Sequence, residues 1–532
     1  MTPVKEKSIE PPEYHSIEEY QNRLRKLQEL KDLNIEPYPH KFDRKDLAEE
    51  LLAKYTDKDF AHFDDAASGS SPSATIAGRV VLFRPMGKNI FAQIQDPTGR
   101  LQVIFNRDLT QIEGYTPKSE SDPKPIKVLE KKVDFGDILG IEGHLFYTQK
   151  GELTLFAKKV TILCKTLLPL PDKHSGLADK GMRYRKRWLD MIVNKPAFDK
   201  LVLRSRIVQR IRQYFYDNNF LEVETPVLQN SYGGAKAKPF MSHLNALDQD
   251  MFLRISIEIA LKKLIVGGMD KIFEIGKVFR NEGIDRTHNP EFTMLECYAA
   301  YWDYNDLMTF TENLFETIAL DLFGDTKIQM STEDGQSHVI DLKTPWKRMT
   351  MKESIKTYAN IDVDKLSEKQ MHELLIKETR LDKGHLKDAN RGSLIAYIFE
   401  EFVEHFLIQP HHIIDHPIET TPLCKLHRNP ELKKEGFVER FESFILCMEM
   451  TNAYSELNDP LIQRDLLEEQ ARRKLAGDEE ANPLDEEFLE AICQGMPPTG
   501  GLGIGIDRLT MLFSNAQAIK DIIFFPLMRP ED

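Results

Sequence analysis

The chain has 532 residues, which is enough for two or three domains. Hydrophobic residues make up 41% and charged residues 29%, a composition typical of a globular chain with a large core. The sequence holds no run of eighteen apolar residues and begins without the apolar stretch of a signal peptide. We therefore expect neither membrane insertion nor export.

The number and spacing of the cysteines argue against two stabilising features. Five are scattered through the chain without a CxxC pair, which argues against a disulfide framework and a structural zinc site and favours a cytoplasmic location. The net charge of -14 argues only weakly against nucleic-acid binding, because an RNA contact depends on local lysines and arginines.

The N-terminal segment predicts disorder over residues 1–15, followed by a helix. Ser16 and Glu19 have the spacing of a capping box, and the helix is expected to end near Asn34. Two interpretations stay open: a solvated helix docked on the next domain, or a basic helix that contacts RNA phosphates. The basic residues concerned are Arg23, Arg25, Lys26 and Lys31.

A small β-barrel is predicted after a linker of small residues at 65–73. Five alternating stretches are separated by glycine, proline and aspartate turns, and a polar insertion at 112–130 predicts a long loop or helix. The expected strands cover residues 74–83, 90–95, 100–106, 136–148 and 153–163.

Strand parity separates the two faces of this barrel. Ile90, Ala92 and Ile94 alternate with Phe91, so that the phenylalanine points outward on a polar face, as Gln102 does on the next strand. A nucleic-acid base can stack on such a ring, and an amide can read a base edge. The alternative is that Phe91 contacts a neighbouring element of the protein.

Prolines near residue 170 mark a second boundary, and the remaining chain predicts one large α+β domain. Three of its stretches carry polar residues suited to chemistry. The first, FLEVETP at 220–226, follows a helix expected over 195–218 and predicts an edge or interface strand, a weak signal by itself.

The second stretch predicts a strand, a long loop and another strand. VFRNEG at 278–283 is followed by HNPEFTMLE at 288–296, with Arg280 and His288 flanking the loop. Phe292, Glu296 and Tyr298 share one parity, so one face offers a ring, an acid and a phenol. A charged hairpin with a core phenylalanine is the alternative interpretation.

The third stretch, GGLGIGIDRL at 500–509, has alternating glycines that leave one strand face bare for a ligand. We exclude a dinucleotide fingerprint because the spacing is GxGxG and little chain follows. Arg508 is expected at the end of this strand or just inside a following helix.

In this order the three stretches resemble the signature motifs of class II aminoacyl-tRNA synthetases. LRISIEIALKKLIVGG, TNAYSELNDP and GLGIGIDRLTMLF are similar to the bacterial-type lysyl-tRNA synthetase family in particular. The resemblance runs from about residue 16 to the end. It implies an OB-fold anticodon-binding domain and a catalytic domain on a mixed, mainly antiparallel sheet. The expected division is 1–73 (tail and helix), 74–165 (OB-fold), 166–182 (linker) and 183–532 (catalytic, with an insertion around 340–435).

The resemblance implies a homodimeric enzyme that activates L-lysine with ATP as lysyl-adenylate and transfers it to the 3' end of tRNA-Lys for protein synthesis. Lysine has an ammonium at each end and one carboxylate, so its recognition needs acids at two places and a cation at a third. The lysine-binding residues implied are Gly234, Glu258, Arg280, Glu296, Tyr298, Asn452, Tyr454 and Glu456.

For ATP, the resemblance assigns the two faces of adenine to Phe292 and Arg508 and the phosphates to Arg280 and His288. Catalysis would rest on positioning and charge stabilisation by Arg280 and Arg508 with Mg²⁺, without a protein nucleophile or general base. The remaining ATP-site residues implied are Glu282, Asn289, Glu442 and Glu449, the last two holding Mg²⁺. Glu442 and Glu449 are seven positions apart, and on one straight strand such residues face opposite ways. A bend, a bulge or a change of strand between them is therefore required.

In the barrel the resemblance assigns anticodon contacts to Phe91, Gln102 and Glu152. One departure from the family pattern concerns Thr287, which stands where many bacterial relatives have arginine.

Three alternatives to this family are weighed. Aspartyl- and asparaginyl-tRNA synthetases would need a cation in place of the acids Glu258 and Glu456. A paralogue that lysylates a translation factor would lack the barrel. A non-catalytic RNA-binding relative would be expected to lose an ATP contact.

Overall fold

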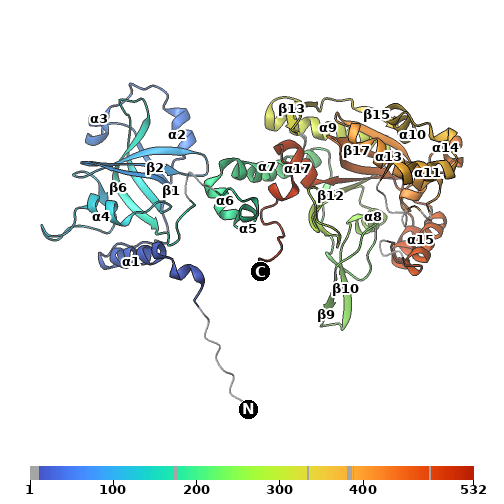
Figure 1. Cartoon of the computed structure of the whole chain (residues 1–532), viewed down its shortest axis with the longest axis horizontal. Helices are drawn as coiled ribbons and strands as arrows, with labels where there is room; N and C mark the ends of the chain where they lie inside the picture. The colour runs from blue at the N-terminus through green and yellow to red at the C-terminus, as the bar shows by residue number, and fades with distance from the viewer. Residues whose placement is uncertain are drawn as a thin grey trace, which may run out of the picture. The chain divides into compact units, whose positions relative to one another are not determined.

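A computed structural model describes residues 11–171, 177–331, 335–379, 386, 389–477 and 481–531. The chain divides into two compact units, Met1–Ala178 and Asp179–Asp532 (Figure 1). Among the described residues, no helix is long and apolar enough to cross a membrane.

The first unit is built around the expected barrel (Figure 1). Its strands follow the order β3-β2-β1-β5-β6-β4, and a parallel pairing of β3 with β6 closes the sheet. Closure pairs the strand edges that an open sheet would expose. The strands are β1 (Ser73–Met86), β2 (Asn89–Gln95), β3 (Arg100–Asn106), β4 (Gln111–Ile112), β5 (Ile138–Tyr147) and β6 (Leu153–Cys164). The predicted OB-fold barrel is confirmed.

The parity prediction for β2 is also confirmed. Ile90, Ala92 and Ile94 are buried in the main barrel core, whereas Phe91 and its alternate neighbours are only half-buried. Phe91 also packs against a second, smaller apolar cluster that includes Ile104, its partner across the strand pair. The ring therefore has a structural contact as well as an accessible part.

Three short helices precede the barrel: α1 (Glu18–Asp32), α2 (Ala48–Lys54) and α3 (Phe63–Ser68). The predicted capping box is wrong. Ile17 is the N-cap of α1, and Ser16 ends a 3₁₀ turn in which its hydroxyl donates to the Glu13 carbonyl. The linker prediction for 65–73 is wrong in part, since α3 continues to Ser68. Of the tail expected to be disordered, residues 1–10 lie outside the described residues, and the prediction is wrong for residues 13–15, which belong to the 3₁₀ turn Glu13–Ser16.

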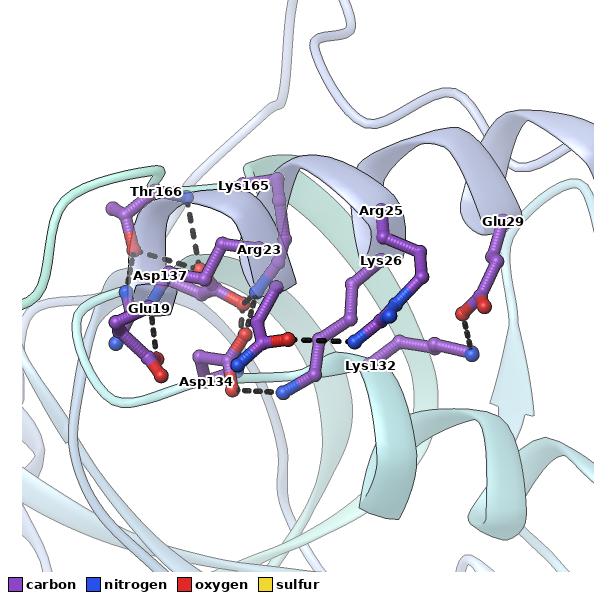
Figure 2. Close-up of polar contacts among 11 residues, drawn as sticks. Glu19, Arg23, Arg25, Lys26, Glu29, Lys132, Asp134, Asp137, Lys165 and Thr166 are labelled. Atoms are coloured by element: carbon purple, nitrogen blue, oxygen red, sulfur yellow. Dashed lines mark hydrogen bonds and ion pairs between the residues drawn. The ribbon is translucent and has the colours of Figure 1, made fainter. Parts of the chain in front are cut away.

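Helix α1 is docked on the barrel through an ion cluster (Figure 2). Arg23 pairs with Glu19 and donates to Thr166, and Lys26 pairs with Asp134 at 2.5 Å. At the centre Lys165, 1% exposed, bonds to both Asp134 and Asp137. These pairs use Arg23 and Lys26 of α1 within the protein and support the docked-helix interpretation, whereas Arg25 and Lys31 are exposed. Helix α4 (Pro125–Lys132) begins within the insertion predicted at 112–130 and ends just beyond it.

The second unit is organised by an eight-stranded sheet in the order β15-β16-β17-β18-β19-β12-β11-β7. The pairs β7–β11 and β15–β16 are parallel and the others antiparallel, so the predicted mixed, mainly antiparallel sheet is confirmed. The strands are β7 (Leu221–Glu222), β11 (Lys271–Phe279), β12 (Glu291–Ala300), β15 (Lys347–Thr350), β16 (His411–Pro417), β17 (Phe437–Ile445), β18 (Met448–Ser455) and β19 (Thr499–Gly505).

One face of this sheet is covered by the helices α7 (Lys195–Asp217), α9 (Tyr304–Phe323) and α17 (Ile506–Ser514). Leu295 and Cys297 of β12, with Leu502 and Ile504 of β19, enter that apolar core. Since side chains alternate along a strand, the residues between them face the other way. The face opposite these helices therefore receives Glu296, Tyr298, Gly501 and Gly503.

The remaining elements frame the opposite face. Helix α8 (Glu258–Val266) packs on β12, and an insertion of short helices packs against β16 and β17 (Figure 1). The other elements of this unit are α5 (Lys180–Arg185), α6 (Arg187–Val193), β8 (Leu228–Gln229), β9 (Met241–Leu244), β10 (Gln249–Leu253), β13 (Lys327–Ser331), β14 (Ser337–Asp341), α10 (Met351–Ser354), α11 (Glu368–Glu378), α13 (Arg391–Phe402), α14 (Pro430–Lys434), α15 (Pro460–Leu475) and α16 (Glu486–Cys493).

Candidate active site

Two adjoining cavities lie on the face of the sheet opposite α9. The first, about 320 Å³, holds most of the residues expected to bind lysine, and the second, about 300 Å³, holds most of those expected to bind ATP. We refer to them as the amino-acid cavity and the nucleotide cavity. Both are lined by Arg280, Met294, Glu449, Asn452 and Gly503, which places these residues at the junction.

Glu296 of β12 is held in the amino-acid cavity by a set of hydrogen bonds. Its Oε1 accepts from the Ser256 hydroxyl at 3.1 Å and the Ile257 backbone N–H at 3.0 Å, and its Oε2 accepts from Tyr298 at 3.3 Å. Burial, reinforced by the charge of Glu258, raises the pKa of Glu296 to about 7. The carboxyl group is thus poised to lose its proton when a cation binds beside it.

Glu258 begins helix α8, and one oxygen of its carboxylate accepts hydrogen bonds from two donors. Its Oε1 accepts from the Tyr454 hydroxyl at 2.6 Å and from the Lys262 ammonium at 2.5 Å. Both Glu258 and Tyr454 line the amino-acid cavity. The i to i+4 spacing on α8 brings Lys262 beneath Glu258.

Glu456, just after β18, is 1% exposed and lies behind the cavity lining instead of in it. Its Oε2 forms an ion pair with Lys262. A methyl group at Gly501 would overlap Glu456 Oε1 and the Tyr298 ring, so the bare glycine strand is what makes room for this carboxylate. In the described part of the chain, Glu456 Oε1 has no hydrogen-bond partner.

Gly234 lines the same cavity with a φ of +84°, a conformation that favours glycine. A Cβ there would lie 2.7 Å from the Ser256 hydroxyl and 3.2 Å from Glu258 Cβ. The backbone at Gly234 therefore approaches the group of acids more closely than another residue would allow.

Glu442 and Glu449 face the same cavity because the chain changes strand between them. Glu442 lies on β17 and Glu449 on β18, with the turn at Leu446 and Cys447, both of positive φ. An irregular register pairs Glu442 with Asn452 but Phe444 with Glu449, so one extra residue of β18 is accommodated. The turn and this bulge together resolve the parity problem of two acids seven positions apart.

Arg280 follows β11 and borders both cavities. Its Nε donates to the Ile255 carbonyl at 3.2 Å, and its guanidinium lies 5.1 Å from the centre of the Phe292 ring. Burial lowers the pKa of Arg280, while the neighbouring Glu282, Glu296 and Glu449 oppose that shift. The structure thus brings the cation and the ring assigned to ATP together at the junction of the cavities.

Arg508 lies in the first turn of α17, just inside the helix. It donates to the Glu449 backbone carbonyl at 2.9 Å, pairs with the Glu449 carboxylate at 3.2 Å and contacts His288 Nε2 at 3.1 Å. Asp285 bonds the other ring nitrogen of His288 at 2.8 Å. Glu282 and Asn289 line the nucleotide cavity as well, and Asn289 Oδ1 is a buried oxygen without a partner among the described residues.

A buried pair joins the third stretch to its surroundings. Asp507, beside Arg508, bonds Arg204 of α7 at 2.5 Å and accepts from the Thr293 backbone N–H at 2.7 Å. Arg204 also donates to the Thr293 hydroxyl at 2.9 Å. The start of α17 is therefore fixed to both α7 and β12, which determines the place of Arg508.

The first unit places its candidate anticodon residues on or beside adjacent strands. Phe91 of β2 and Gln102 of β3 are half-buried, and the Gln102 amide donates to the Thr154 hydroxyl at 2.8 Å. Glu152 is exposed just before β6, beside the strand that pairs with β3.

Sequence reasoning missed several residues of the site. Arg440 lines the amino-acid cavity, where it donates to Glu442 at 2.5 Å and to Asn452 at 3.1 Å. Its parity with Glu442 on one strand was an available signal. Lys262 was equally visible, four positions after Glu258. The pair of Arg204 and Asp507 joins residues 303 positions apart, and no local pattern indicates it.

Comparisons with known proteins agree with this arrangement. A family model described as tRNA synthetases class II (D, K and N) matches residues 179–529, and one described as an OB-fold nucleic acid binding domain matches residues 74–163. The chain belongs to the class II aminoacyl-tRNA synthetase family of the D, K and N type.

Similar curated proteins cover nearly the whole chain. A lysine–tRNA ligase of Chlamydia pneumoniae is 53% identical over 98% of this chain and 98% of its own length. A lysine–tRNA ligase of Enterococcus faecalis is 44% identical over 95% of this chain and 96% of its own. One of Methanoculleus marisnigri is 43% identical over 95% and 94%.

Proposed function

We propose that this chain is a lysine–tRNA ligase. It activates L-lysine with ATP to form lysyl-adenylate and pyrophosphate, and it then transfers the lysyl group to the 3' end of tRNA-Lys. The similarity to lysine–tRNA ligases extends over both units, so it includes the nucleic-acid-binding barrel as well as the catalytic unit.

The observation that carries the choice of amino acid is the acidic character of the amino-acid cavity. Glu258 and Glu296 line it, and Glu456 lies directly behind Gly501. We assign the α-ammonium to Glu296 and the Gly234 backbone, and the ε-ammonium to Glu258, Glu456 and Tyr298. Arg280 and Asn452 are assigned to the carboxylate and Tyr454 to the alkyl stem.

The family description also covers aspartate and asparagine, so the family alone does not select the substrate. An aspartate site would need an uncompensated cation opposite the side-chain carboxylate. Lys262 is bound to Glu258 and Glu456, Arg440 is bound to Glu442, and Arg280 is assigned above to the carboxylate of the substrate. The acids are in excess, which favours a substrate with a cationic side chain.

For ATP, we assign adenine to the space between Phe292 and Arg508, beside Asn289 and Glu282, and the phosphates to Arg280 and His288. Glu442 and Glu449 fit Mg²⁺ because they are two oxygen donors on one cavity wall. The described residues include no group of three or more potential metal ligands, so phosphate oxygens would complete the coordination. When bound, the ion would neutralise charge on the phosphates.

The reaction needs no nucleophile from the protein. The lysine carboxylate attacks the α-phosphorus, and pyrophosphate leaves in line. The terminal ribose hydroxyl of the tRNA then attacks the carbonyl of lysyl-adenylate, so that the ester bond forms, the bond between the carbonyl carbon and the phosphate oxygen breaks, AMP leaves and the hydroxyl proton is released. Arg280 borders both cavities and can neutralise charge where the carboxylate meets the α-phosphate. Its bond to Ile255 and the contacts of Arg508 with Glu449 fix both cations before substrates bind.

We further propose a homodimer, a cytoplasmic location and an anticodon contact through Phe91, Gln102 and Glu152. The dimer is supported by β7, an edge strand of the large sheet on which Leu221 is 56% exposed. The location follows from the proposed role in protein synthesis.

The test is amino-acid-dependent exchange between pyrophosphate and ATP, measured on the full chain with magnesium. We expect exchange with lysine and little with aspartate, asparagine or arginine. A folded protein that binds ATP but shows no exchange with lysine would contradict the proposal. The alternative function would then be RNA binding by the barrel.

A further inference from the structure

A lysine of the protein already occupies the group of acids assigned to the substrate ammonium. Lys262 is fully buried, and its ammonium bonds Glu258 at 2.5 Å and pairs with Glu456. The same ammonium lies 5.5 Å from the Tyr454 ring centre and 5.8 Å from that of Phe488. No step of the mechanism above uses it.

We infer that Lys262 is a positioning and specificity residue: an internal counter-ion that holds Glu258 and Glu456 in place and leaves room for one further ammonium between them. This inference rests on the proposed function and deepens it.

The charges of the three acids assigned to the two ammonium groups support this role. When ionised, Glu258, Glu296 and Glu456 carry three negative charges, and Lys262 cancels one of them. The two that remain equal in number the two ammonium groups of free lysine. Without Lys262 the site would hold an excess carboxylate, which would take up a proton or a foreign cation.

Geometry shows how Lys262 could orient its partners without excluding the substrate. The ammonium uses Glu258 Oε1 and Glu456 Oε2, while Glu456 Oε1 points toward Gly501 and Tyr298 and has no partner among the described residues. That oxygen is left to receive a ligand. Tyr454 ties the other carboxylate of the pair in place through its 2.6 Å bond to Glu258.

The ionisable groups facing Lys262 come from several elements. Glu258 lies on the same helix as Lys262, Tyr454 lies on β18 with Glu456 just after it, and Glu296 and Tyr298 lie on β12. Cys424 pairs with Glu456 through an isolated backbone β-bridge. The two acids beside it raise the pKa of Lys262 against the effect of burial. Burial raises the pKa of Glu456, and the Lys262 ammonium opposes that rise.

The experiment compares Lys262→Met with Lys263→Met in the full chain. Lys263 is the next residue on α8, pairs with Glu487 on the surface and controls for the lost charge. Lysine and ATP KM are measured by pyrophosphate exchange from pH 6 to 9. For K262M we expect lysine KM to rise at least tenfold, ATP KM to stay within about twofold, and the pH profile of lysine KM to move to higher pH.

Three results would overturn the inference: an unchanged lysine KM and pH profile in K262M, a lower lysine KM, which would make Lys262 a competitor of the substrate, or the same changes in K263M. If K262M does not fold, Lys262→Gln is measured in the same way. Wild-type protein without lysine-dependent exchange would instead contradict the proposed function itself, so the two failures are distinguishable.

Discussion

Glu296 is a single carboxyl group whose protonation should control lysine binding. Its pKa is about 7 without ligand because burial removes it from water and Glu258 repels its charge. In the proposed assignment, the α-ammonium of lysine binds the ionised form of Glu296. Lysine affinity should therefore be full above pH 7 and fall about tenfold per pH unit below it, until the lower pKa of the complex is reached.

Calorimetric titration of lysine into the protein between pH 5.5 and 8.5 measures this dependence directly. Glu296→Gln is the matched control, since the amide keeps the shape of the side chain but cannot titrate. We expect weaker binding by this variant, with a much flatter pH profile. A wild-type dissociation constant that does not change between pH 5.5 and 7 would contradict the assignment.

At the scale of elements, one buried pair fixes the start of helix α17. Asp507 is 2% exposed and bonds both Arg204 and the Thr293 backbone, so removal of Arg204 leaves a buried acid uncompensated. Loss of one partner of such a pair costs about 3–5 kcal/mol. Because Arg508 follows Asp507 directly, Arg204→Met should also raise the ATP KM at least tenfold.

The control for this variant is Arg206→Met, an exposed arginine on the same helix. Chemical denaturation and ATP KM are measured for both proteins. Stability and ATP KM should change together in R204M and stay near wild type in R206M. A destabilised R204M with a normal ATP KM would show that the pair supports the fold without positioning Arg508.

Elements also show where sequence reasoning succeeds and where it stops. The alternation of Phe292, Glu296 and Tyr298 places them on one face because strand parity is a local property. Glu442 and Glu449 face one cavity because of a turn and a bulge between them. A bulge depends on the register with a partner strand, which the local sequence does not reveal. The capping box failed because Ser16 bonds backward to Glu13, a choice that spacing alone does not reveal.

On the scale of the whole molecule, the alternating stretches at 74–163 predicted a barrel, the resemblance of the later motifs implied a synthetase-type sheet, and both are present. The contacts that hold each unit together were less predictable. Lys165 is charged and looks like a surface residue in the sequence, yet it is buried between Asp134 and Asp137 (Figure 2). Such compensation depends on distant partners, so composition and periodicity do not contain it.

Two units with separate tasks should be separable by mutation. Phe91 is assigned to stack on an anticodon base, an interaction worth roughly 1–3 kcal/mol. Phe91→Leu keeps an apolar side chain against Ile104 but removes the flat ring. We expect the KM for tRNA-Lys in aminoacylation to rise roughly five- to hundredfold, while lysine-dependent pyrophosphate exchange stays within about twofold of wild type.

The matched control is Phe83→Leu, because Phe83 packs partly buried against the main barrel core and is not assigned to RNA. If F91L and F83L lose tRNA charging equally, the ring of Phe91 acts through barrel stability. If F91L loses pyrophosphate exchange as well, the barrel is not confined to tRNA binding. Selective loss of charging in F91L alone would assign anticodon recognition to the exposed part of this ring, on the face that strand parity separates from the barrel core.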